Sequence, residues 1–231
     1  MNEAVQAMAH GQADRIARAY LPEHPLGNRW DYYYSRAKLG SDPLYPGVSA
    51  ALRGTRAPLL DLGCGLGLLA HTLLADGIRL PYRGVDSDAA KIRRATRAAA
   101  RVGLDQAVFE TVDLAHEVPE HRGSVVMLDV LQFIPYPAQA RAIDAMIAML
   151  TPGARLVIRT GLDDGTHRAR ITLAVDLFSR ALGWMNAMPR YYPNGEGLRA
   201  RLREAGLDVE FTPLFGRTPF NNWRIVAARP E

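Results

Sequence analysis

The stretch that decides the fold reads Leu-Leu-Asp-Leu-Gly-Cys-Gly-Leu-Gly at residues 59–67. Its short apolar run contains one acid and is bounded by glycine, which is typical of a buried strand. Three glycines then alternate, and residues 66–75 continue with a helical pattern. Because glycine has no Cβ, the backbone can turn tightly there and a ligand can approach it closely. The stretch therefore predicts a strand, a glycine turn and a helix that together cradle a nucleotide-like ligand.

The spacing of the glycines indicates which ligand. A dinucleotide site needs G-x-G-x-x-G, but the third glycine here comes one position early and Leu68 follows it. The sequence also lacks the P-loop pattern of a phosphate site. The arrangement instead resembles motif I of class I S-adenosylmethionine-dependent methyltransferases. This resemblance implies S-adenosyl-L-methionine as the cofactor, bound by Asp61, Gly63, Cys64, Gly65 and Gly67.

Three further predicted strands each lead into an acid. Asp86 follows Gly67 at roughly the 20-residue spacing that places a carboxylate on ribose hydroxyls. In the resembled family the acid after the third strand meets the adenine edge, and the segment after the fourth lines the cofactor and faces the substrate. Each acid alone could be an ordinary strand-end residue, but ligands of open α/β sheets bind at the carboxyl ends of strands. The additional cofactor residues implied are Asp86, Ser87, Asp113, Leu114, Asp129 and Val130.

The order of elements predicts an α/β fold. The resemblance implies a Rossmann-like methyltransferase fold: a mostly parallel seven-stranded sheet with helices on both faces, closed by two late antiparallel strands, and an N-terminal helical cap. It covers residues 57–160 well and the ends more loosely. We expect a cap over 1–56 and the methyltransferase domain over 57–231, forming one compact unit. Expected helices are 3–20, 45–52, 66–76, 88–102, 137–150, 167–185 and 195–205.

Substrate recognition is expected outside the cofactor half. Aromatic residues are dense in segments 30–34, 184–192 and 220–223, which favours a partly apolar acceptor pocket. The same loops could be turns held together by aromatic packing. Arg36 is a candidate partner for the methionine carboxylate, since its planar fork matches a carboxylate. The alternative is that this region is a tyrosine cluster packing the cap onto the core.

Catalysis leaves fewer signals in the sequence. Methyl transfer mostly requires two partners to be positioned, and a base is needed only if the nucleophile arrives protonated. His167 lies just past the fifth strand and is the candidate base, although a lone histidine can also be structural. Asp129, Asp163 and Asp164 could suggest a magnesium site. The metal-dependent O-methyltransferases are expected to show Asp-Asn at the last two positions, so we predict that no metal is needed.

Composition agrees with one globular domain. The chain has 231 residues, 48% hydrophobic and 23% charged. Its net charge of +4 could suggest a nucleic-acid partner, but the arginines are scattered along helices, which argues against one. No apolar run has the length of a membrane span, and no signal peptide is recognisable. We therefore expect a cytoplasmic protein whose partner is a small molecule.

These observations predict an enzyme that transfers a methyl group from S-adenosylmethionine to a small, partly apolar acceptor. Two alternatives stay open: a cofactor-binding partner subunit without chemistry, and an NAD-dependent oxidoreductase, which the glycine spacing disfavours. The tyrosine-rich cap and the ending at residues 216–223 are similar to bacterial methyltransferases of aryl-polyene pigment clusters. That similarity implies an aromatic or polyketide-like acceptor.

Overall fold

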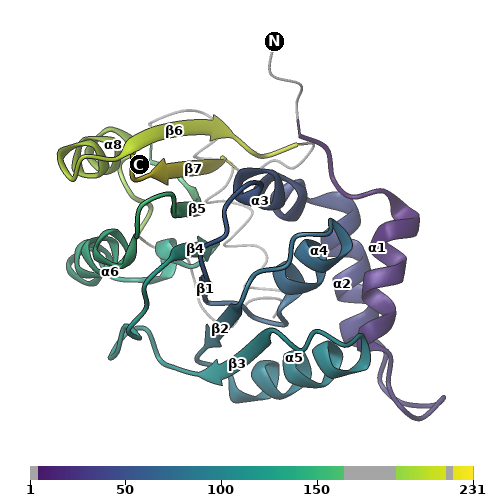
Figure 1. Cartoon of the computed structure of the whole chain (residues 1–231). Helices are drawn as coiled ribbons and strands as arrows, with labels where there is room; N and C mark the ends of the chain where they lie inside the picture. The colour runs from purple at the N-terminus through teal and green to yellow at the C-terminus, as the bar shows by residue number, and fades with distance from the viewer. Residues whose placement is uncertain (1–4, 164–190, 217–220, 231) are drawn as a thin grey trace.

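A seven-stranded sheet forms the centre of the molecule in the computed structural model, which describes residues 5–163, 191–216 and 221–230 (Figure 1). The strand order is β3-β2-β1-β4-β5-β7-β6. The first five strands run parallel, and β7 pairs antiparallel with both β5 and β6. The strands are β1 (Leu59–Leu62), β2 (Tyr82–Asp86), β3 (Ala107–Thr111), β4 (Ser124–Leu128), β5 (Arg155–Gly161), β6 (Asp208–Pro213) and β7 (Asn222–Ala228).

Helices cover both faces of this sheet, as predicted. The described helices are α1 (His10–Ala17), α2 (Trp30–Ser41), α3 (Leu44–Leu52), α4 (Leu68–Ala75), α5 (Ala89–Arg101), α6 (Tyr136–Met149) and α8 (Gly195–Glu204), with short 3-10 turns η1 (Arg18–Tyr20) and η2 (Leu131–Phe133). Figure 1 shows α6 and α8 on one side and α3, α4 and α5 on the other, with α1 and α2 outside them.

The core divides into three clusters that follow these layers. Alternation along the strands sends Leu156 and Ile158 toward α6 and α8, and Val157 toward α3 and α4. A third cluster joins α1, η1 and α2 to α4 and α5, with Ile16 and Leu39 buried in it. The N-terminal segment is therefore fixed to the molecule by apolar packing, and α3 within it packs directly on the sheet.

Two boundaries and one helix differ from the sequence-based expectations. The first helix begins at His10, with residues 1–4 outside the described part. The third strand, expected over residues 108–113, ends at Thr111, so Asp113 lies in the turn after it. Helix α2 was not predicted, because its aromatic residues obscure the periodicity. The expected helix at 167–185 lies outside the described residues.

Candidate active site

The glycine turn after β1 forms an open backbone cradle. Gly63, Gly65 and Gly67 all have positive φ, at 83°, 56° and 73°, a region that residues with a side chain rarely adopt. A Cβ added to Gly65 would meet no atom within 4 Å, so the space in front of its backbone is open. The turn thus exposes main chain at the carboxyl end of the sheet, where ligands of such folds bind.

Asp86 ties this turn to the end of β2. Its Oδ2 accepts a hydrogen bond from the Gly65 amide at 2.9 Å, and its Oδ1 accepts one from the Asp88 amide at 2.9 Å. Each carboxylate oxygen can accept a second hydrogen bond, so two acceptor positions stay open for a ligand diol. Ser87 beside it is exposed, and Asp88 caps α5 by accepting from the amides of Ala90 and Lys91.

Asp61 lies beneath the turn rather than at its surface. It is buried, and its Oδ2 accepts a short hydrogen bond from the Tyr82 hydroxyl. Burial raises the pKa of Asp61 to about 7, against the opposing effect of the Tyr82 hydrogen bond. Its Oδ1 is buried and has no hydrogen-bond partner among the described residues. A buried acceptor of this kind can hold the turn or a cationic ligand group close to it.

Cys64 fills space within the turn. A Cβ on Gly84 of β2 would come within 2.9 Å of its Sγ, so the two segments touch. Burial raises the pKa of the Cys64 thiol, which removes the thiolate that reactive cysteines need. Cys64 therefore contributes to the site by packing the turn against β2 and not by chemical reactivity.

The turn after β3 is placed at the surface of the same sheet edge. Asp113 is exposed, and its oxygens accept from the Ala115 amide at 2.9 Å and contact His116 Nδ1 at 3.0 Å. These contacts, the backbone hydrogen bond first, lower the pKa of Asp113. Leu114 is half-buried and packs against the core. A role for these two residues at the adenine stays a prediction.

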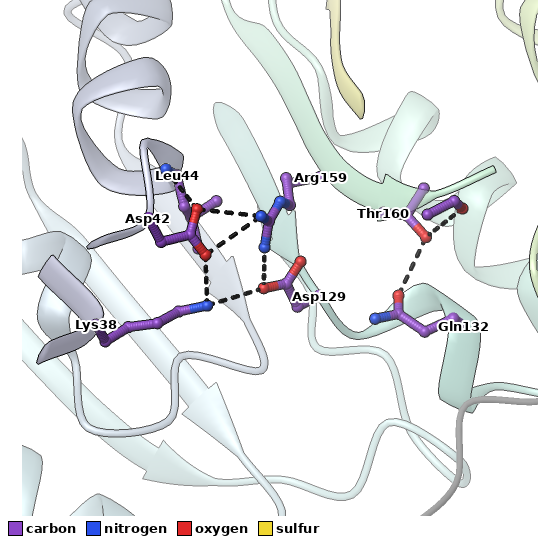
Figure 2. Close-up of polar contacts among 8 residues, drawn as sticks. Lys38, Asp42, Leu44, Asp129, Gln132, Arg159 and Thr160 are labelled. Carbon is purple, nitrogen blue, oxygen red and sulfur yellow. Dashed lines mark hydrogen bonds and ion pairs between the residues drawn. The ribbon is translucent and has the colours of Figure 1, made fainter. Parts of the chain in front are cut away.

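Asp129 after β4 belongs to a network of four charged side chains (Figure 2). It forms ion pairs with Arg159 of β5 and, at 3.5 Å, with Lys38 of α2. Asp42, at the end of α2, contacts the same two cations, at 3.1 Å to Arg159 and 2.7 Å to Lys38. The network joins the N-terminal helices to the carboxyl ends of β4 and β5.

Opposite charges within the network favour the ionised forms of Asp129, Lys38 and Arg159. Burial alone would raise the pKa of Asp129, but Arg159 and Lys38 lower it below the usual value. Burial would lower the pKa of Lys38, and the carboxylates of Asp129 and Asp42 raise it instead. Lys38 is therefore a cation at neutral pH and cannot serve as a base. With two cations and two carboxylates, the network is neutral overall.

Sequence reasoning missed Lys38, Asp42 and Arg159, and proposed Arg36 on the same helix. Positions two apart on a helix are about 200° apart, so Arg36 and Lys38 leave different faces. Arg36 is half exposed, with its Nε 3.8 Å from Asp14 of α1. Its role at the methionine carboxylate stays a prediction. The missed residues lie far apart in sequence, and no local pattern joins them.

Comparison with known proteins identifies the family. Residues 39–211 match the family described as "Methyltransferase domain". The chain belongs to the class I S-adenosylmethionine-dependent methyltransferases.

Relatives named ubiquinone biosynthesis O-methyltransferase support this assignment. The protein from Xanthomonas campestris pv. campestris is 30% identical over 187 residues, covering 81% of this chain and 77% of the relative. The one from Xanthomonas euvesicatoria pv. vesicatoria is 27% identical, covering 80% and 76%. Magnesium protoporphyrin IX methyltransferase from Synechocystis, solved with S-adenosylhomocysteine, shares the fold with a TM-score of 0.64 and 20% identity, covering 94% of this chain and 93% of that one.

The residues at the glycine turn fit the cofactor of this family, S-adenosylmethionine. The backbone at Gly65 is open, and the free acceptor positions of Asp86 suit ribose hydroxyls. The cofactor supplies a methyl group already activated by its sulfonium. The chain therefore has to hold the donor and exclude water, and to align the acceptor. The spacing of the glycines in this turn argues against NAD as the ligand. Membership of a methyltransferase family argues against a cofactor-binding subunit that has no catalytic activity.

The structure says little about the predicted base and the possible metal ligands after β5. His167 and Asp164 lie outside the described residues. Asp163 is exposed, and its amide donates to the Pro193 carbonyl at 3.1 Å. Within the described ranges, no three His, Cys, Asp or Glu residues are grouped to hold a metal ion. In the same part of the chain, no helix is long and apolar enough to span a membrane.

Proposed function

We propose that this methyltransferase transfers its methyl group to an oxygen of a small, partly apolar acceptor, aromatic or polyketide-like. The observation that carries the proposal is a tyrosine pair beside the turn after β4. Tyr136 is 54% exposed and meets Tyr191 edge to face, with ring centroids 5.4 Å apart. The Tyr191 amide donates to the Gln132 carbonyl at 3.1 Å, so the pair is attached to that turn.

This position suits an acceptor wall. The turn follows Asp129 and Val130. Val130 rests against the glycine loop, and Tyr192 packs on Gly161 at the end of β5. Apolar, aromatic-lined sites with few polar groups are usual for small ligands. The choice of oxygen rests on the O-methyltransferase relatives.

A macromolecular acceptor has less support. Described arginines on several elements are engaged in ion pairs with neighbouring acids rather than gathered in one groove: Arg83 with Glu110, Arg94 with Asp31, and Arg201 with Asp144. A nucleic-acid site needs clustered, available cations.

We also propose His167 as the base that removes the acceptor proton, from its place in the sequence just past β5. Loss of such a base lowers the rate about 10²–10⁴-fold. The His167→Ala variant should lose kcat at neutral pH and recover at a pH where the acceptor ionises by itself. A pH-independent loss, or none, would remove His167 from this role.

A labelled-methyl assay tests the acceptor class. The full chain is incubated with methyl-labelled S-adenosylmethionine and RNA, DNA, protein lysate, or a panel of phenolic and polyketide hydroxyl compounds. We expect label in the small molecules. Transfer to RNA or protein, with none to the panel, would contradict the proposal and leave the cofactor assignment in place.

The tyrosine pair can then be tested separately. Tyr136→Ala should raise the KM for the acceptor several-fold without changing the KM for S-adenosylmethionine. Tyr136→Phe keeps the ring and loses only the hydroxyl, which donates to the Tyr192 carbonyl at 3.4 Å. It should behave nearly as the wild type. Equal kinetics for all three proteins would place the acceptor elsewhere.

A further inference from the structure

Arg159 is a charged side chain in the interior of the protein. It lies in the carboxyl-terminal half of β5, is 2% exposed, and is held between Asp42 and Asp129 (Figure 2). Burying a guanidinium is costly unless charges and hydrogen bonds compensate it. Arg159 is therefore stable in the interior only with both of its carboxylate partners, Asp42 and Asp129.

On one side, Arg159 fixes an unusual backbone. Asp129 has φ 59°, and it is the non-glycine residue with positive φ in the described part of the chain. Its amide donates to the Arg159 carbonyl at 2.8 Å, and its carboxylate accepts from the Arg159 guanidinium. Such conformations persist only where surrounding contacts hold them. Arg159 holds Asp129 through both its backbone and its side chain.

The residue after Asp129 rests on the cofactor loop. A Cβ on Gly63 would lie 2.3 Å from Cγ2 of Val130, so only a glycine fits beneath that side chain. The position of the Asp129 turn therefore sets how Val130 presses against the glycine loop. Packed contacts of this kind transmit small displacements because interiors are close-packed.

On the other side, Arg159 reaches the N-terminal helices. Its Nη2 donates to both Asp42 oxygens, at 3.1 Å and 3.2 Å. Asp42 also accepts from the Leu44 amide at 3.0 Å, at the start of α3, and from Lys38 of α2. One carboxylate thus joins two helices of the N-terminal segment to Arg159.

We propose that Arg159 is a positioning residue that makes cofactor affinity depend on the N-terminal helices. The contacts run from Asp42 through Arg159 and Asp129 to Val130 and Gly63. Neither Asp42 nor Arg159 has to touch the cofactor for this. Docking of the N-terminal helices stabilises the left-handed Asp129 turn and, through it, the shape of the glycine loop.

Strand β5 provides a matched control. Arg155 lies four residues earlier and so leaves the same face of the strand. It also reaches the N-terminal segment, because its guanidinium donates to the Ala51 carbonyl of α3. It does so at the opposite end of the strand, away from the glycine loop. Arg155 and Arg159 therefore attach the same segment to the same strand at two ends.

The test measures binding of S-adenosylhomocysteine to the full chain by calorimetry, with the melting temperature of each variant as a separate readout. Arg159→Met should weaken affinity by on the order of tenfold. Arg155→Met should lower the melting temperature but keep affinity within about twofold of the wild type. Because removing Arg159 leaves two carboxylates that share Lys38 as their one remaining cation in the network, Arg159→Lys and Asp42→Asn are measured as milder variants. Both should weaken affinity, with Arg159→Lys closer to the wild type than Arg159→Met.

Three outcomes would overturn the proposal. One is wild-type affinity in folded Arg159→Met and Asp42→Asn proteins. Another is equal weakening by Arg155→Met, because any loosening of the N-terminal segment would then suffice. The third is failure of all three network variants to fold, which would assign the network to folding. Kinetics add a further distinction, since positioning of the loop should raise the KM for S-adenosylmethionine and leave the KM for the acceptor unchanged.

Discussion

The glycine loop and the buried charge network lie at the same end of the sheet but are built in different ways. The loop joins β1 to the next strand along the chain, β2, through residues 21 positions apart, with the Gly65 amide donating to Asp86. The network joins segments that are far apart, pairing Asp42 with Arg159 and Lys38 with Asp129. The loop exposes backbone to a ligand, whereas the network compensates buried charge inside the protein. A cofactor site here thus depends both on a local motif and on tertiary pairing.

The largest effect is expected from Gly65→Val. The side chain would occupy the open space in front of the loop and strain a residue at φ 56°, so affinity for S-adenosylhomocysteine should fall below detection in calorimetry. Gly77→Val is the matched control, since Gly77 also has positive φ and open space but lies after α4. Normal binding by Gly65→Val, or equal loss in the control, would mean that the loop is not the cradle.

The packing of α4 against the N-terminal segment should give the next largest effect, on stability. His71 is buried, its ring is tilted against that of Tyr20 with centroids 5.3 Å apart, and burial lowers its pKa to about 4. The unfolded chain binds a proton below pH about 6.5, whereas the folded chain resists it. Burial of neutral His71 therefore contributes fully to the free energy of unfolding above pH 6.5. This contribution is lost as pH falls toward 4, by at most about 3 kcal/mol.

Denaturant unfolding at several pH values checks this against His71→Phe. The raised pKa of Asp61 acts in the opposite sense, because its contribution is lost as pH rises toward 7. The difference between the two proteins isolates the histidine. If the difference in free energy of unfolding between the wild type and His71→Phe is the same at pH 7 and pH 4.5, His71 is not held neutral by burial.

A smaller effect is expected from Asp86→Ala. Loss of a charge-assisted contact that leaves donors unpaired costs about 1–3 kcal/mol, so binding of S-adenosylhomocysteine should weaken by roughly 5- to 150-fold. Asp88→Ala is the control: it removes the cap of α5 and about 1 kcal/mol of stability. It should leave cofactor affinity unchanged. The reverse pattern would move the ribose contact from Asp86 to Asp88.

No effect is expected from metal removal. The activated methyl group needs no Lewis acid, and the sequence offers no clean ligand set. Turnover measured with saturating EDTA should equal that without it. A large loss restored by Mg²⁺ would instead assign Asp129, Asp163 and Asp164 as ligands.

The same contrast explains what the sequence could predict. The glycine turn, the parallel strands before it and after it, and most helix positions follow from local patterns. The seven-stranded sheet with its closing antiparallel pair follows from the resemblance to the family. The burial of Asp61 under the turn with Tyr82 was not predicted, because it depends on the inward orientation of its side chain within β1, and its role toward the cofactor stays a prediction. Arg159 reads as one more arginine in an apolar strand. Its partners come from residues 38–42 and 129, and only the folded chain brings them together.

One measurement tests both regions together: hydrogen–deuterium exchange of the full chain with and without S-adenosylhomocysteine. The account predicts slower exchange in peptides covering 59–67 and 84–90, where the loop and Asp86 hold the cofactor. It also predicts slower exchange at 36–46 and 128–134, through the charge network, and no change over 195–213. Protection confined to the loop would contradict the coupling, and unchanged exchange at 59–67 would contradict the site itself.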